Sequence, residues 1–246
     1  MGRRMADWGR WAERALDILY PPRCPYCGEV IATGERTCGS CSAEDQRIRE
    51  PRCIRCGRSR PDCTCSEKGP PKYYRGLTAP FYFEGAVCGA VYRLKRDPYP
   101  ARVLGGEMAR SLREAFAGMD WDWITCVPMS RKKRRSRGFN QSEELARQVA
   151  GRLEIPYRSL LDLEFEPQIQ HSLTAEERRA NVLGAYCVRR NAPVEGCRIL
   201  LVDDVFTTGS TAVECAKVLM FSGAQSVHLL CAAITLPEKR NGRVDK

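Results

Sequence analysis

Two regimes of hydrophobic patterning divide this chain of 246 residues. From about residue 77 onward, short apolar runs alternate with stretches in which apolar residues recur every three or four positions. The runs predict strands at 77–85, 123–127, 184–188, 198–203 and 226–235, and the periodic stretches predict helices at 86–95, 101–117, 142–153 and 212–222. Strands that alternate with helices predict an α/β fold, with a mostly parallel sheet covered by helices on both faces.

The first 75 residues follow a different pattern. Residues 5–20 carry apolar and charged side chains at helical spacing and end before Pro21, which predicts an amphipathic helix that docks on protein or, alternatively, on a membrane surface. Cys, Gly, Arg and Pro dominate residues 24–75, so this segment buries little apolar surface and needs metal to hold its shape. We expect an amphipathic helix at 1–22, a cysteine-rich zinc-binding module at 23–70 and an α/β domain at 71–246.

Eight of the 14 cysteines lie in the cysteine-rich module. In a chain without a secretory signal, cysteines paired at short spacing indicate metal ligands before disulfides. The first set comprises Cys24, Cys27, Cys38 and Cys41, two C-x-x-C pairs that suit a tetrahedral zinc site. The second set comprises Cys53, Cys56, Cys63 and Cys65, and its last pair is C-x-C. Two structural zinc ions agree with this spacing, and so does one zinc with the remaining thiols free or paired crosswise.

The sequence ILLVDDVFTTGST at 199–211 places polar groups between a strand and a helix. Free backbone N–H groups at the start of a helix attract an anion, and Gly209 lets a ligand approach because it has no Cβ. Hydroxyl donors follow at Thr207, Thr208, Ser210 and Thr211. Asp203 and Asp204 would repel phosphate, but they suit ribose hydroxyls, or Mg²⁺ held through water. The segment predicts a site for a ribose that carries phosphate; the alternative is a Thr/Gly-rich turn that only caps the helix.

A second polar segment follows the strand at 123–127. We expect a basic loop here, in which residues 131–137, RKKRRSR, concentrate six cations in seven positions. A diphosphate needs cations and exposed amides close to the ribose site, so Ser130, Arg131 and Lys132 are candidate contacts. The alternative is a solvated surface loop.

The 199–211 segment resembles the PRPP signature of type I phosphoribosyltransferases, except that Phe206 stands where an aliphatic residue is usual. The resemblance implies the parallel-sheet fold of these enzymes for residues 71–246. It also implies that Asp203 and Asp204 act in catalysis by holding the ribose 2′- and 3′-hydroxyls, and that Val205 lies in the PRPP site. Thr207–Thr211 would cradle the 5-phosphate. Mg²⁺ would accompany PRPP.

Two further segments, VPMSRKKRRSRGFNQ and QHSLTAEERRANVLGAY, resemble the ComF family, as does the order of a cysteine-rich module before the α/β domain. The resemblance implies that residues 170–186 form a loop that closes over PRPP, with Gln170 and Arg178 as lid contacts. A charged helical turn is the alternative for this segment. The family also implies a role in natural competence, on single-stranded DNA and beside a helicase partner.

The charge of the chain agrees with anionic ligands. A net charge of +10 favours nucleotide phosphates, nucleic acid or an anionic membrane surface. No apolar run approaches the roughly 18 residues of a membrane helix, so we expect a cytoplasmic protein without a membrane span. Three functions fit: a phosphoribosyltransferase with an unidentified acceptor, acting in DNA uptake; a nucleobase-salvage phosphoribosyltransferase; and a non-catalytic module that binds PRPP or single-stranded DNA.

Overall fold

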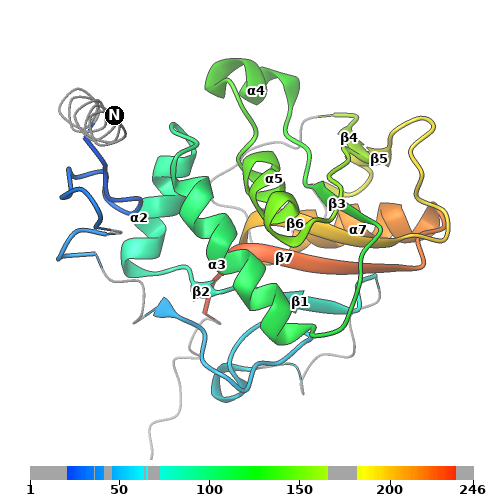
Figure 1. Ribbon diagram of the computed structural model, residues 1–246. Helices are drawn as coiled ribbons and strands as arrows, with labels where there is room; N and C mark the ends of the chain where they lie inside the picture. The colour runs from blue at the N-terminus through cyan, green and yellow to red at the C-terminus, as the bar shows by residue number, and fades with distance from the viewer. Residues whose placement is uncertain are drawn as a thin grey trace, which may run out of the picture.

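A parallel sheet forms the centre of the protein in a computed structural model, which describes residues 21–35, 37–41, 46–63, 65, 73–165 and 182–236. The strand order is β1 (Gly76–Thr78), β7 (Ser226–Ile234), β6 (Arg198–Phe206) and β3 (Trp123–Cys126), and β2 (Phe81–Tyr82) also pairs with β7 (Figure 1). All these pairs are parallel. β6 and β7 are almost continuous apolar runs, as expected for central strands that are buried on both faces.

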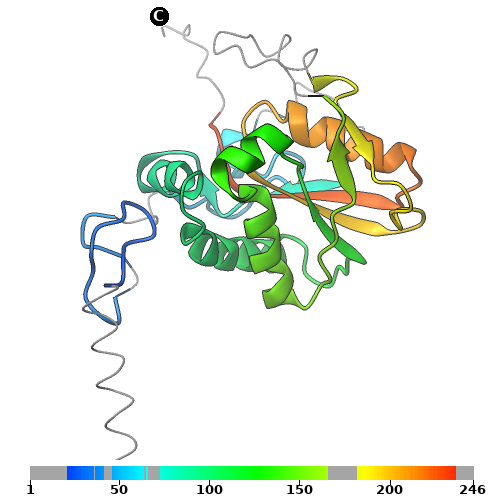
Figure 2. The ribbon, with the colours of Figure 1, turned by 90° about the horizontal axis from the view of Figure 1, so that it is seen from above.

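Helices cover both faces of the sheet. Contacts join α2 (Gly85–Leu94), α3 (Pro100–Ala115) and α5 (Gln141–Leu153) into one layer, and α7 (Ser210–Phe221) lies on the opposite face (Figures 1 and 2). Each layer buries its own apolar cluster against the sheet, one around Leu200 and Val202 and the other around Ile199 and Leu201. The expected α/β fold, with a cysteine-rich module before it, is confirmed.

Three elements differ from the pattern that the sequence predicts. The strand expected at 184–188 is β5 (Tyr186–Val188), which pairs antiparallel with β4 (Leu161–Leu163) in a separate small sheet. The basic segment after β3 is a helix, α4 (Arg131–Arg137), because Ser130 caps its start and Gly138 ends it with φ of 83°. β6 continues past Asp203 to Phe206, so the acidic pair lies inside the strand.

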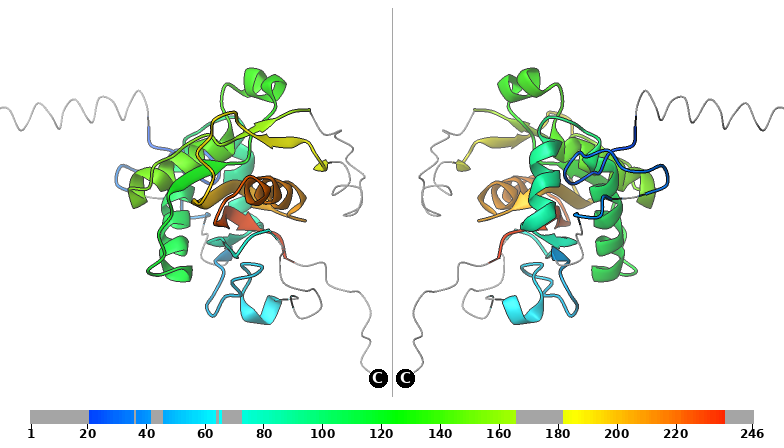
Figure 3. Two further views of the ribbon diagram at one scale, coloured as in Figure 1. Left: turned by 90° about the vertical axis from the view of Figure 1, so that its right-hand side faces the viewer. Right: turned by 90° about the vertical axis from the view of Figure 1, so that its left-hand side faces the viewer.

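The two halves of the cysteine-rich module lie at different places on the α/β domain. Residues 22–35 and 37–41 lie beside α2. Residues 47–63 and 65, with the short helix η2 (Arg60–Asp62), lie beneath β1 and β2 (Figures 1 and 3). Residues 1–20 of the predicted N-terminal helix, together with Gln170 and Arg178, fall outside the described residues. No helix of the described part is both long and apolar enough to cross a bilayer.

Candidate functional site

The loop after β6 brings its hydroxyl groups to the start of α7. Gly209 caps α7 with φ of 73°, a left-handed conformation that glycine adopts without steric cost. The buried ring of Phe206 lies where a Cβ at position 209 would be, which gives this unusual residue a packing role. Thr208 Oγ1 lies 2.8 Å from Ser210 Oγ, and Thr207 is exposed. The loop therefore presents hydroxyls and the first amides of α7 at the carboxyl edge of the sheet.

Asp203 and Asp204 are held by hydrogen bonds to their own strand and to α5. Asp203 Oδ1 accepts from the hydroxyl of Ser142 at 2.9 Å and from the backbone N–H of Asp204 at 2.9 Å. Asp204 Oδ1 accepts from the N–H of Val205 at 2.7 Å. These donors fix the direction of both side chains before any ligand binds, which lowers the entropic cost of binding one.

The acidic pair sits in an environment that opposes its negative charge. Burial, together with the neighbouring carboxylate of Asp204, raises the pKa of Asp203 to about 8. Burial also raises the pKa of Asp204, and the charges of Lys95 and Arg137 act against this rise. A ligand that brings hydroxyl donors or a divalent cation would relieve the repulsion, so the donor set fits a ribose with Mg²⁺.

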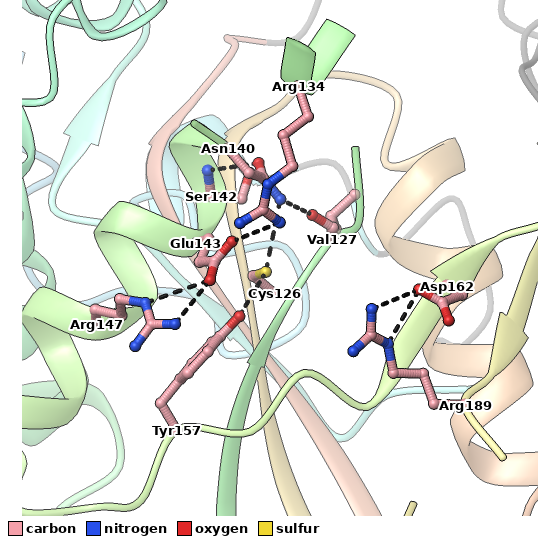
Figure 4. Close-up of polar contacts among 10 residues, drawn as sticks. All are labelled: Cys126, Val127, Arg134, Asn140, Ser142, Glu143, Arg147, Tyr157, Asp162 and Arg189. Carbon is pink, nitrogen blue, oxygen red and sulfur yellow. Dashed lines mark hydrogen bonds and ion pairs between the residues drawn. The ribbon is translucent and has the colours of Figure 1, made fainter. Parts of the chain in front are cut away.

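Asn140 ties α5 to the end of β3 and thereby places Ser142 (Figure 4). Its Oδ1 accepts from the N–H of Ser142 at 3.2 Å, and its Nδ2 donates to the carbonyl of Val127 at 3.0 Å. The sequence alone indicates that Asn140 caps α5, because Asn is common at the position before a helix. The contact between Ser142 and Asp203 spans 61 positions, and no local pattern reveals it.

Glu143 links α4 to α5 (Figure 4). Its buried carboxylate lies 3.1 Å from Arg134 of α4 and 2.8 Å from Arg147, whose guanidinium lies 4.6 Å from the ring centroid of Tyr157. The ion pair between Glu143 and Arg134 therefore connects α4 to α5. Arg134 is largely exposed, so the ion pair contributes at most about 1 kcal/mol.

The residues predicted to contact the diphosphate lie at the same edge of the sheet as the loop after β6. β3 pairs with β6 through Cys126 and Val202, so the segments that follow the two strands are neighbours. Ser130 is buried and accepts the N–H of Lys133 at 3.3 Å as the cap of α4. Arg131 and Lys132 are exposed. The structure brings these residues near the edge that carries the loop, and their contact with a ligand stays a prediction.

The end of the predicted lid segment is anchored on α7. The hydroxyl groups of Tyr186 and Thr211 interact, and burial raises the pKa of Tyr186. The N–H of Gly184 donates to Glu214 at 3.0 Å. Residues 182–188 therefore fix the exit of this segment at the start of α7, next to the predicted 5-phosphate site.

The first cysteine set converges on one point, as predicted. The sulfurs of all four cysteines lie within 4.8 Å of one another, and those of Cys27 and Cys38 are 3.6 Å apart. Zn–S bonds of about 2.3 Å in a tetrahedron require S–S distances of roughly 3.8 Å, so the geometry fits zinc. Burial opposes ionisation of Cys24, but backbone N–H groups, among them that of Cys27, lower its pKa to about 6.

The second set also forms a cluster, despite its C-x-C pair. Its four sulfurs again lie within 4.8 Å, with 3.7 Å between those of Cys56 and Cys63. The turn η2 delivers Cys63, and the backbone N–H of Cys65 points back at the Cys63 sulfur at 3.4 Å. Burial opposes ionisation of Cys53, yet backbone donors lower its pKa to about 7. The cysteine spacing left two interpretations open, one zinc site or two, and this geometry favours two.

Comparison with known proteins agrees with this organisation. The double zinc ribbon domain matches residues 15–91. The DNA utilization protein YhgH of Salmonella typhi is 31% identical over 231 residues, which cover 89% of this chain and 100% of that protein. Competence protein F of Haemophilus influenzae is 24% identical over 220 residues, covering 84% of this chain and 94% of that protein. Among solved structures, the glutamine PRPP amidotransferase from B. subtilis overlaps 54% of this chain and 26% of its own, with 24% identity and a TM-score of 0.37.

The alignments with YhgH and competence protein F cover 89% and 84% of this chain, which is more than either the cysteine-rich module or the α/β domain alone. The chain belongs to the ComF family, which includes the YhgH DNA utilization proteins and competence protein F.

Proposed function

We propose that this protein binds PRPP with Mg²⁺ at the loop after β6 and acts as a phosphoribosyltransferase-like component of DNA uptake or use, on single-stranded DNA. The observation that supports this most is the position of Asp203 and Asp204 beside the start of α7, at the carboxyl end of a central parallel strand. The names of the relatives, DNA utilization and competence, support the connection with DNA.

Each part of the site suits one part of PRPP. The carboxylates of Asp203 and Asp204 accept hydrogen bonds from the ribose hydroxyls, and Val205 continues the strand beside them. The hydroxyls and amides of Thr207–Thr211 hold the 5-phosphate. Ser130, Arg131 and Lys132 reach the diphosphate. When bound, Mg²⁺ supplies positive charge to the leaving pyrophosphate.

The reaction transfers the ribose 5-phosphate group. The bond between the ribose C1 and the pyrophosphate oxygen breaks, pyrophosphate leaves with the bonding electrons, and the acceptor bonds to C1 and gives up a proton. Gln170 and Arg178 are proposed lid contacts that exclude water, which would otherwise hydrolyse the donor. The acceptor is unidentified. A nucleobase-salvage enzyme and a binder without catalysis are the two alternatives.

Calorimetry with Mg²⁺ and PRPP tests the proposal. Asp203→Asn with Asp204→Asn should weaken binding at least about tenfold, because charged acceptors contribute roughly 1.5–3 kcal/mol per hydrogen bond. Asp120→Asn is the matched control, since Asp120 is exposed and precedes β3 at the opposite edge of the sheet. Unchanged affinity in the double variant would refute the site.

The pH dependence of the same affinity gives a second readout. Ribose hydroxyls and Mg²⁺ favour the ionised carboxylate, so binding lowers the pKa of Asp203 and releases a proton. Affinity should therefore rise as pH increases toward about 8, to which burial raises the pKa of Asp203, and should level off above it. Asp203→Asn should remove this part of the profile and leave only the titration of PRPP itself.

Pyrophosphate release separates the alternatives. Release that depends on single-stranded DNA supports transfer in DNA use, and release with one nucleobase supports salvage. PRPP binding without release from any nucleobase, nucleoside or DNA identifies a binder.

A further inference from the structure

A cavity of about 890 Å³ lies outside the loop after β6 and is walled by three segments that are far apart in the chain. The turn of the first cysteine set, residues 24–28, which we call the first zinc knuckle, forms one wall. α2 and the turn after it form the second wall, and the end of α4 forms the third. The lining residues are Tyr26, Cys27, Gly89, Tyr92, Arg93, Lys95, Arg96, Ser136 and Arg137. We call this cavity the knuckle cleft.

The knuckle cleft is cationic. Four of its nine lining residues are Lys or Arg, and none of the nine is Asp or Glu. Arg93 is occupied, since it pairs with Asp97 at 2.9 Å and donates to the carbonyl of Cys24. Within the described part of the chain, Lys95, Arg96 and Arg137 form no ion pair. Cations gathered in a concave, poorly solvated surface create a strong positive potential that an anionic ligand would neutralise.

An aromatic ring stands among these cations. Tyr92 is 57% exposed, an unusual position for a large ring. Tyr92 packs edge-on against Phe83, with 5.8 Å between the two ring centroids. The Nζ atom of Lys95 lies 5.0 Å from the centroid of the Tyr92 ring. Unpaired bases stack on exposed aromatic rings of this kind, which lie beside cations that can bind the phosphates of the nucleic-acid backbone.

The first zinc knuckle packs directly against α2. Gly89 of α2 lies so close to the knuckle that a Cβ there would come within 2.9 Å of the carbonyl oxygen of Tyr26. The bond from Arg93 to Cys24 adds a second attachment. The charges of Lys95 and Arg137 also act on Asp204, where they oppose the rise of its pKa, so this side of the cleft lies near the acidic pair.

We propose that the knuckle cleft binds single-stranded nucleic acid, with Lys95, Arg96 and Arg137 on the sugar-phosphate backbone and one base stacked on Tyr92. This inference deepens the proposed function, on which it rests, by giving the strand a binding site next to the ribose site. A single strand fits better than a duplex, because stacking on Tyr92 needs an unpaired base. The zinc of the first knuckle then maintains a wall of the nucleic-acid site.

Fluorescence anisotropy with a labelled oligothymidylate of about 15 nucleotides, at roughly 50 mM salt, tests this assignment. Arg96→Glu should weaken binding about tenfold or more, because Arg96 is exposed in the cleft and bonds to no other side chain within the described residues. Arg190→Glu is the matched control: Arg190 is also exposed, but it follows β5 on the far side of the domain, and its replacement should change affinity less than twofold (Figure 1).

A second pair of variants separates stacking from charge. Tyr92→Ala should weaken binding about tenfold, whereas Tyr92→Phe should retain the wild-type affinity, because only the ring is needed. Equal losses in Arg96→Glu and Arg190→Glu, or equal affinity for duplex and single strand, would overturn the inference. Displacement of the oligonucleotide by equimolar dTMP or inorganic phosphate would also overturn it, since the cleft would then hold a small anion.

Calorimetry with PRPP on the same samples distinguishes this inference from the proposed function. Arg96→Glu should leave PRPP affinity within twofold of wild type, because the cations with the largest effect on Asp204 are Lys95 and Arg137, not Arg96. Loss of oligonucleotide binding with PRPP binding intact supports a separate nucleic-acid site. PRPP binding without any oligonucleotide binding by the wild-type protein refutes the cleft assignment and the action on single-stranded DNA, but leaves the PRPP site standing. Oligonucleotide binding without PRPP binding refutes the PRPP site and leaves the cleft assignment standing.

Discussion

The two zinc knuckles, residues 24–28 and 53–57, are locally alike but differ in what surrounds them. Both have the sequence C-x-x-C-G, and in both the N–H of the first cysteine donates to the carbonyl five positions later, from Cys24 to Glu29 and from Cys53 to Arg58. The first knuckle contacts α2 and walls the knuckle cleft. The second is built into the edge of the sheet. The same local motif therefore serves a binding surface in one place and the fold in the other.

Several polar contacts hold the second knuckle on the sheet. The N–H of Leu77 in β1 donates to Ile54 at 2.8 Å, and the guanidinium of Arg58 donates twice to the carbonyl of Thr235, at 2.9 and 3.0 Å. The hydroxyl of Tyr82 donates to Asp62 at 2.6 Å. Those groups would lose their partners if the second knuckle unfolded, and buried polar groups without partners are costly.

Removing each zinc site gives the largest predicted difference between the knuckles. Cys53→Ser with Cys56→Ser should lower the midpoint of thermal unfolding by about 10 °C or more, because zinc binding at structural sites contributes directly to folding. Cys24→Ser with Cys27→Ser should lower it by only a few degrees, weaken oligonucleotide binding about tenfold and leave PRPP binding intact. Calorimetric scans and zinc content check both variants. An equal loss of stability in the two would show that the knuckles have the same role.

Two equivalent glycines give a smaller and sharper contrast. Gly57 and Gly28 both have positive φ, at 72° and 88°, so alanine costs roughly 1–2 kcal/mol at either position. At Gly57 the new Cβ would also lie 2.5 Å from Ile234 and 3.2 Å from the backbone carbonyl of Leu77, whereas at Gly28 its nearest neighbour is a terminal nitrogen of the Arg93 side chain at 3.0 Å, with no backbone atom among the nearest. Crowding adds about 1–3 kcal/mol at Gly57. Denaturant unfolding should show Gly57→Ala as the more destabilised variant, and the reverse order would contradict the comparison.

The sequence predicted the central features of the fold because they depend on local patterns. Continuous apolar runs marked β6 and β7, and the acidic pair before small hydroxylated residues marked the loop. Both cysteine sets converge, even though the C-x-C pair ending in Cys65 left the second one open. The turn η2, which positions Cys63, could not be anticipated from cysteine spacing.

Features that depend on contacts between distant segments were not predictable in this way. The short run around Tyr186 has the pattern of a sheet strand, but its pairing with β4 depends on packing against α7. The basic segment was expected to be a loop, since its charges conceal the caps at Ser130 and Gly138. The contact of Ser142 with Asp203 and the convergence of three segments on the knuckle cleft appear only once the chain is folded.

The most direct test of the account is a crystal structure of the protein soaked with PRPP and Mg²⁺. We predict density for the ribose hydroxyls at the carboxylates of Asp203 and Asp204, and for the 5-phosphate at the amides and hydroxyls of Thr207–Thr211. The knuckle cleft should remain free of PRPP. Density for PRPP in the cleft, or a 5-phosphate away from the start of α7, would contradict the account.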